Sequence, residues 1–195
     1  MKGYFGIGVE GVSKAMNVGA LFRTAHAFGA SFIFTVAAAY RRGELGNADT
    51  SDTPGHVPTW HFDDLKTLAL PLGCRLVGIE ITPDAIELPS FRHPRQAAYV
   101  LGSEREGLSR ELQGLCDHIV RIPTRFSVNL GIAGALVMYD RTLSLGRFAE
   151  RPVAAGGPRE ALPVPAFGEP LYKKRARQRA ARARLLSRHG TATTD

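Results

Sequence analysis

Short apolar segments alternate with helix-like segments along most of this chain. The apolar segments are rich in β-branched and aromatic residues, which favour strands. They lie at 4–10, 31–37, 74–81, 97–102 and 117–123. Helices are predicted between and after them, at 17–30, 63–72, 109–116 and 129–148. Strands that alternate with helices form a mostly parallel sheet covered by helices on both faces, so the pattern predicts an α/β fold.

Basic residues are concentrated at the C-terminal end of the chain. The net charge is +7, and residues 171–195 hold eight Lys or Arg beside one acidic residue, so the rest of the chain is neutral. Residues 151–170 hold five of the twelve prolines. We therefore expect a domain at 1–150, a linker at 151–170 and a basic tail at 171–195. Such a tail favours a polyanionic partner; a solvated tail that only aids solubility is the alternative.

The sequence lacks the marks of a secreted, membrane-spanning or metal-binding protein. Its start, MKGYFGIGVEG, has no apolar region followed by a small-residue cleavage site. The longest aliphatic run, around 32–40, is too short to cross a bilayer. Cys74 and Cys116 have no metal-ligand spacing with each other or with the six histidines. We expect a cytoplasmic protein with no metal and no membrane partner.

The helix predicted at 17–30 carries an arginine opposite its core-facing stripe. Asn17 stands where an N-cap belongs. Arg23 lies between Ala20 and Ala27, where an ordinary exposed face would carry Lys, Glu or Gln. This arrangement indicates contact with another subunit or a substrate, and a plain surface arginine is the alternative. The core-facing stripe consists of Val18, Leu21, Phe22, Ala25 and Phe28.

A second candidate site is the stretch LGSEREGLS at 101–109, which follows a predicted strand and precedes a helix capped by Ser109. Ligands of parallel sheets bind at the carboxyl ends of strands. The stretch lacks the Gly-Lys-Ser/Thr of a phosphate-binding loop. Glu104 and Glu106 would repel phosphate, so a ligand with hydroxyls or positive charge fits better. The alternative is a turn that uses its glycines for geometry, with solvated glutamates.

A third candidate site opens the last predicted helix. Pro123 ends the preceding strand, and Ser127 and Asn129 can satisfy amide groups at the helix start. Gly131 and Gly134 lie on one face, three positions apart, so a ligand or another helix can approach the backbone closely. Packing of one helix against another is the alternative to a ligand, and both can hold together.

In this order and spacing, the three stretches resemble the motifs of the SpoU/TrmH family of RNA ribose 2′-O-methyltransferases, within the SPOUT superfamily. The resemblance covers about residues 4–148. It departs from the family pattern where only three residues separate Pro123 from Ser127, and at Gly131, where the family often has a second serine. The residues that carry it are Asn17, Gly19, Arg23, Ala25 and FG at 28–29, LGSEREGLS at 101–109, RIP at 121–123 and SVN at 127–129.

The resemblance implies an α/β fold with a trefoil knot near its C-terminus, and a homodimer. It also implies that loops at 78–82, 101–107 and 121–131 hold S-adenosylmethionine. The cofactor-binding residues would then be Ile81, Leu101, Gly102, Glu104, Gly107, Ile122, Ser127, Asn129 and Leu130.

By the same resemblance, Arg23, Asn17 and Glu104 are the candidate catalytic residues. Arg23 would either deprotonate the ribose 2′-hydroxyl or hold the adjacent phosphate. Since a guanidinium has a pKa above about 12, the second role is equally tenable. Asn17 would orient Arg23 or the substrate, and Glu104 would brace the site.

RNA is the expected partner, and two further segments are candidates for binding it. The polar, turn-rich segment 41–62 is expected to be a surface loop. The basic tail lacks an apolar stripe, so folding onto RNA is more plausible than packing on a core. A non-catalytic RNA-binding protein, or a methyltransferase acting on protein or a small molecule, are the alternatives. The expected RNA contacts are Arg23, Arg41, Arg42, Lys173, Lys174, Arg175, Arg177 and Arg179.

Overall fold

The computed structural model describes residues 3–38, 53–146, 148–149 and 151–157. The chain divides into two compact units, Met1–Arg147 and Phe148–Asp195. In the second unit, the described residues form neither helix nor strand. The basic tail and most of the predicted linker lie outside the described residues.

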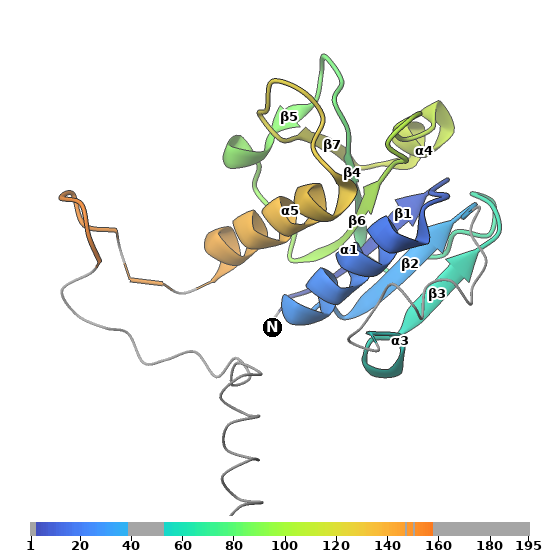
Figure 1. Cartoon of the computed structure of the whole chain (residues 1–195), viewed down its shortest axis with the longest axis horizontal. Helices are drawn as coiled ribbons and strands as arrows, with labels where there is room; N and C mark the ends of the chain where they lie inside the picture. Colours follow the sequence, from blue (N-terminus) through green and yellow to red (C-terminus); the bar gives the residue numbers. More distant parts are fainter. Residues whose placement is uncertain (1–2, 39–52, 147, 150, 158–195) are drawn as a thin grey trace, which may run out of the picture. The chain divides into compact units, whose positions relative to one another are not determined.

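The described part of the first unit is built on a sheet of seven strands (Figure 1). Their order across the sheet is β3-β2-β1-β6-β4-β7-β5, and every neighbouring pair is parallel. This topology confirms the predicted parallel α/β fold. The strands are β1 Tyr4–Glu10, β2 Phe32–Val36, β3 Thr59–Phe62, β4 Arg75–Ile79, β5 Ile86–Glu87, β6 Gln96–Leu101 and β7 His118–Arg121.

Helices cover the sheet on two faces. On one face, α1 (Ala15–Ala27) and α5 (Leu130–Leu145) lie side by side (Figure 1) and enclose the larger core with the apolar residues of β1 and β6. On the other face, α4 (Arg110–Leu115) and the segment 63–74 cover a second core. Two short elements complete the described part, α3 (Thr53–His56) and the 3-10 helix η1 (Leu88–Ser90).

The prediction of a helix at 63–72 is wrong. The segment forms turns, in which the amide of Thr67 donates to the carboxylate of Asp64 at 2.9 Å. The same bond can cap a helix at its start, but Pro71 lies inside the predicted segment and disfavours helical backbone before it. Leu65, Leu68 and Leu70 still pack against the second core. The segment therefore has the apolar content of a covering helix without its hydrogen bonds.

Two further predictions need correction. The segment 41–62 is not wholly a loop, because its last residues form the edge strand β3, which pairs with β2. Asn17 is not an N-cap, because α1 begins at Ala15 with Lys14 before it, and Asn17 therefore lies in the first turn.

Two predicted helix caps are confirmed. Ser109 precedes α4, and its hydroxyl accepts a hydrogen bond from the amide of Leu112 at 3.1 Å. Asn129 precedes α5, and its side chain accepts one from the amide of Gly131 at 2.9 Å. Each side chain satisfies an amide that the helix leaves without a partner.

The glycines of α5 pack against α1. A Cβ atom on Gly134 would lie under 3.0 Å from the side chain of Leu21, and one on Gly131 would lie 3.6 Å from Ala20. Helix packing within the chain therefore accounts for Gly134, which fits its burial in the core.

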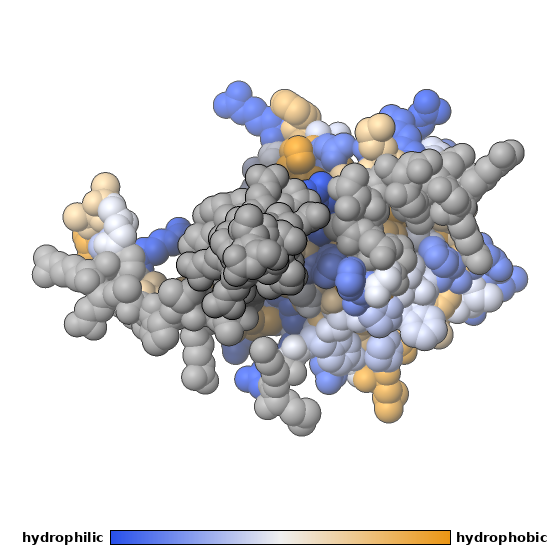
Figure 2. All heavy atoms as spheres, turned by 60° about the horizontal axis from the view of Figure 1, so that its bottom comes forward, coloured by the Kyte–Doolittle hydropathy of each residue, from blue (hydrophilic) through white to orange (hydrophobic). Residues whose placement is uncertain are grey.

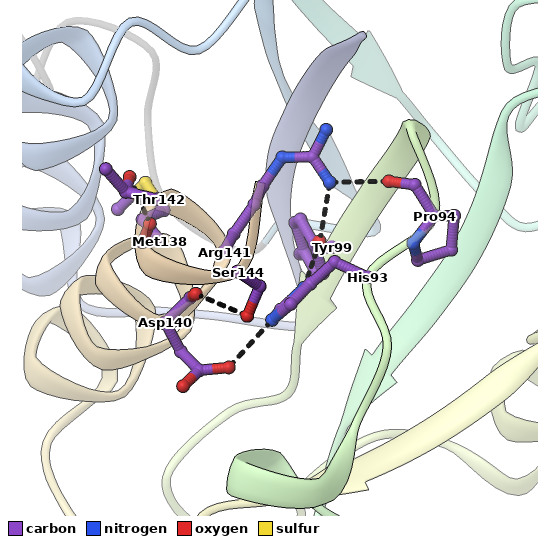
Figure 3. Close-up of polar contacts among 8 residues, drawn as sticks. All are labelled: His93, Pro94, Tyr99, Met138, Asp140, Arg141, Thr142 and Ser144. Atoms are coloured by element: carbon purple, nitrogen blue, oxygen red, sulfur yellow. Dashed lines mark hydrogen bonds and ion pairs between the residues drawn. The ribbon is translucent and has the colours of Figure 1, made fainter. Parts of the chain in front are cut away.

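A buried network of hydrogen bonds connects the C-terminal half of α5 to the sheet (Figure 3). Arg141 is only 6% exposed. Its guanidinium donates to the carbonyls of Pro94 at 2.6 Å and Arg95 at 2.8 Å, and to the hydroxyl of Tyr99 at 3.1 Å. His93 bonds to Tyr99 at 2.6 Å and to Asp140 at 2.9 Å. The buried charge is thus satisfied by fixed acceptors, as a buried cation requires.

Exposed apolar side chains are distributed over several parts of the surface. On the face drawn in Figure 2, apolar residues lie among hydrophilic ones.

In the described part of the chain, no helix is long and apolar enough to cross a membrane.

Candidate active site

A pocket of about 340 Å³ lies at the carboxyl ends of β4, β6 and β7. This is the edge where ligands of parallel sheets bind, and the volume is in the range of small-molecule sites. Three loops and the start of α5 form its walls. The loops are residues 80–81 after β4, 102–107 after β6, and 122–128 after β7.

The pocket gathers most of the residues that the sequence predicted for a cofactor. Asn129 is the exception, because it caps α5 and lines a different groove. Since these residues come from three separate loops, the fold brings together stretches that are far apart in the sequence. The predicted residues that line the pocket are Ile81, Leu101, Gly102, Glu104, Gly107, Ile122, Ser127 and Leu130.

Charged side chains line the pocket in addition to backbone. Glu80, Glu104 and Glu106 are the acidic residues of its lining, and Arg105 and Arg121 are the basic ones. The surplus of carboxylates fits a ligand that carries positive charge or hydroxyls better than one that carries phosphate. Arg121 also pairs with a glutamate of β5, at a distance of 2.9 Å.

Glycines give the loop after β6 its shape. A Cβ on Gly102 would lie under 3.0 Å from the backbone of Gly107, where the loop closes on itself. Gly107 has a φ of +67°, a left-handed conformation that favours glycine. Its amide donates to the carbonyl of Ser103 at 2.9 Å. The geometric role that the sequence left open for these glycines is therefore real, and it builds a wall of the pocket.

Two carboxylates that the sequence reasoning missed hold this loop. Glu80 follows β4 and accepts hydrogen bonds from the amides of Leu108 at 2.7 Å and Ile81 at 2.8 Å. Glu10 ends β1 and accepts from the amide of Ser109 at 2.8 Å and from its hydroxyl at 2.6 Å. One signal in the sequence could have identified them. Each glutamate directly follows an apolar run, as the last residue of GIGVE and of VGIE.

Asn17 and Glu104, two of the three predicted catalytic residues, are in contact. The side-chain amide of Asn17 donates to the carboxylate of Glu104. Glu104 lines the pocket, so the contact joins α1 to the pocket wall.

Arg23, the third predicted catalytic residue, lies elsewhere. It is exposed on α1 and is not among the residues that line the pocket of its own chain. Of the other predicted RNA contacts, Arg41, Arg42 and the tail residues lie outside the described part of the chain.

A second, apolar groove runs between α1 and α5, beside Arg23. Ala20, Thr24 and Phe28 line it from α1. From α5, Ile132 and Tyr139 line it and are 54% and 52% exposed. Large apolar side chains this exposed, gathered in one groove, indicate a surface that another molecule covers.

Among the described residues, no three His, Cys, Asp or Glu side chains gather in a way that could hold a metal ion.

Comparison with known proteins relates this chain to RNA methyltransferases. Residues 5–139 match the sequence model of the SpoU rRNA Methylase family. An uncharacterized tRNA/rRNA methyltransferase of Archaeoglobus fulgidus is 28% identical over 155 residues, which cover 75% of this chain and 66% of the relative. A 23S rRNA (guanosine-2′-O-)-methyltransferase of Bordetella pertussis is 31% identical over 144 residues, which cover 68% of this chain and 56% of the relative.

A solved structure shares the fold. The AdoMet-bound rRNA methyltransferase of Sinorhizobium meliloti superposes with a TM-score of 0.64 at 22% identity, covering 74% of this chain and 58% of that chain. This chain spans 56% to 66% of the length of the two curated relatives.

Proposed function

This chain belongs to the SpoU rRNA Methylase family, and from that membership we propose that it transfers a methyl group from S-adenosylmethionine to a ribose 2′-hydroxyl of tRNA or rRNA. One observation carries the proposal. The stretches that resemble the family motifs meet at one place, where the second and third form the pocket and the first contacts it through Asn17 and Glu104. The names of the relatives, which specify tRNA, rRNA and 2′-O-methylation, support the substrate class.

The residues of the pocket fit S-adenosylmethionine. This cofactor carries a sulfonium and an ammonium cation, a carboxylate and ribose hydroxyls, and when bound it supplies the methyl group. Glu104 and Glu106 are acceptors suited to the cations and hydroxyls, and Arg105 and Arg121 are donors suited to the carboxylate. Residues 102–107 also line the pocket, so backbone groups of this loop are candidates for further hydrogen bonds.

The protein's share of the chemistry is to position and activate the ribose hydroxyl. Transfer would form the bond from the oxygen to the methyl carbon, break the bond from the sulfur to that carbon and release the hydroxyl proton to water. It needs these three atoms in line, and fixed geometry supplies much of the rate enhancement. Asn17 fixes the carboxylate of Glu104 at the pocket wall. Arg23 would hold the phosphate next to the target ribose, because its planar guanidinium matches phosphate oxygens and keeps its charge.

A homodimer explains why Arg23 lies outside its own pocket. We propose that a second copy of the chain covers the apolar groove between α1 and α5. Arg23 is next to Thr24 and one turn from Ala20, both of which line that groove. A second copy there would bring the arginine to the rim of a subunit interface, where RNA can reach both chains.

The proposal extends to the knot, the tail and the location. A trefoil knot near the C-terminus remains a proposal based on the family membership. The domain at 1–150, the linker at 151–170 and an RNA-binding basic tail at 171–195 remain proposals based on composition. An RNA-modifying role also favours the cytoplasm.

Calorimetric titration of the full chain with S-adenosylmethionine and S-adenosylhomocysteine tests the proposal. Saturable binding near one site per chain is the expected result, followed by screening of tRNA and rRNA for methyl acceptance. A folded protein that binds neither compound would favour the rival function, a non-catalytic RNA-binding protein with the same body.

A further inference from the structure

The loop after β6 is held from both sides by carboxylates of the adjacent strands. In the sheet, β6 lies between β1 and β4. Glu10 is the last residue of β1, and Glu80 directly follows β4. Glu80 accepts from the amide of Leu108, and Glu10 accepts from the amide of Ser109, the next residue. The end of one pocket wall is thus fixed to two neighbouring strands.

Glu80 differs from Glu10 because it lines the pocket and also accepts a hydrogen bond within the loop after β4, to which it belongs. Its Oε2 accepts from the amide of Leu108 at 2.7 Å, and its Oε1 accepts from its neighbour, the amide of Ile81, at 2.8 Å. Glu80 and Ile81 both line the pocket. One carboxylate therefore links the loop after β4 to the loop after β6.

The glycine at position 107 leaves room for the carboxylate of Glu80. A Cβ atom on Gly107 would lie under 3.0 Å from Oε2 of Glu80, so a larger residue at 107 would push the carboxylate away. The left-handed φ of Gly107 already favours glycine. The carboxylate of Glu80 therefore occupies space that is open only because residue 107 has no side chain.

We propose that Glu80 is a positioning residue, which sets the spacing of two pocket loops and thereby the affinity for S-adenosylmethionine. This inference rests on the proposed function. A carboxylate suits the task because both of its oxygens accept, and hydrogen bonds to a charged acceptor are about twice as strong as neutral ones. Glutamine in its place offers one acceptor and one donor, so one of the two amides loses its partner.

The test compares Glu80→Gln with Asp117→Asn in the full chain. Asp117 accepts from the amide of Leu76 at 2.8 Å, so it makes the same kind of bond to β4 away from the pocket. We expect Glu80→Gln to raise the dissociation constant for S-adenosylhomocysteine about tenfold. We expect Asp117→Asn to leave that constant unchanged, although both variants should be destabilised in urea unfolding.

Hydrogen exchange gives a second readout. In Glu80→Gln, whichever of the amides of Ile81 and Leu108 loses its partner should exchange faster than in the wild type. Unchanged affinity, or unchanged exchange at both amides, would overturn the inference. If Glu80→Gln does not fold, Gly107→Ala disturbs the same link from the loop side, and unchanged affinity in that variant would overturn it equally. Failure of the wild type to bind S-adenosylhomocysteine would count against the proposed function itself, which separates the two results.

Discussion

Asn17, in the first turn of α1, donates a hydrogen bond from its side-chain amide to the carboxylate of Glu104, which lies 87 positions later in the chain. The bond connects the helix that carries Arg23 to the wall of the pocket. This polar contact therefore joins two parts of the proposed active site.

Asn17→Asp should reduce methyl transfer at least about tenfold, because it places a second carboxylate against Glu104, and like charges repel. The measurement is incorporation of labelled methyl groups from S-adenosylmethionine into RNA. The double variant Asn17→Asp with Glu104→Gln again pairs a donor with an acceptor and should regain part of the activity. Full activity in Asn17→Asp alone would show that the contact plays no part in the reaction.

Arg23→Ala should abolish methyl transfer while leaving the affinity for S-adenosylmethionine within a few-fold of the wild type. The reason is that Arg23 is not among the residues that line the pocket of its own chain. Turnover and calorimetric titration measure the two effects separately. Arg110→Ala, which changes an exposed arginine of α4, is the matched control and should retain activity. Equal losses of affinity and turnover in Arg23→Ala would contradict this division of roles.

Ile132→Asp should convert a dimer into monomers and remove methyl transfer. Ile132 lies in the apolar groove and is 54% exposed, so a charge there would be buried without a partner in the proposed interface. Leu115→Asp is the control, because Leu115 is 56% exposed on α4, away from the groove. Sedimentation velocity measures the mass of each variant. A wild type that sediments as a monomer would refute the assignment of the groove.

Gly134→Ala should lower the free energy of unfolding by about 1–3 kcal/mol, the usual cost of overpacking a core. Its new Cβ would lie under 3.0 Å from Leu21 of α1. Gly114→Ala is the matched helical control, since a Cβ there meets nothing within 4 Å. Urea unfolding should show no loss for Gly114→Ala. Equal stabilities of the two variants would mean that α5 can move away from α1 without cost.

Stability should fall as the pH is lowered below about 7, through the titration of His93. Burial lowers the pKa of His93 below its ordinary value of 6.5, and the hydrogen bond to Asp140 opposes this shift only in part. Between the lowered pKa and 6.5, the unfolded chain binds the proton more readily than the folded one, so stability is lost as the pH falls.

Urea midpoints of the wild type and His93→Gln across this pH range measure the effect. The variant is expected to be less stable at neutral pH, since it loses the bonds of the buried network. Its stability should nevertheless depend less on pH. Parallel curves for the two proteins would contradict the role of His93.

Much of the fold was predictable because strands and helices leave a local periodic pattern. The parallel α/β architecture and the caps at Ser109 and Asn129 follow from such patterns and are confirmed. The helix predicted at 63–72 is absent although its leucine spacing suits a helix, because Pro71 near its end disfavours helical backbone before it. A prediction from apolar spacing alone gives too little weight to such a residue.

The site was predictable where its residues lie in recognisable stretches, and less so elsewhere. Glu10 and Glu80 were missed because an acidic residue after an apolar run reads as the end of a strand. Their role depends on β6 lying between β1 and β4, which no local pattern reveals. Gly134 could not be assigned to a ligand or a helix contact until Leu21 was found beside it.

The most direct test of the proposed reaction is to identify the methylated nucleoside. The full chain would be incubated with S-adenosylmethionine carrying a deuterated methyl group and with total tRNA and rRNA from cells lacking this protein. The RNA would then be digested to nucleosides for mass spectrometry. We predict a deuterium-labelled nucleoside whose methyl group lies on the ribose 2′-oxygen. Label confined to a base, or no label in any RNA in the presence of a protein that binds the cofactor, would contradict the account.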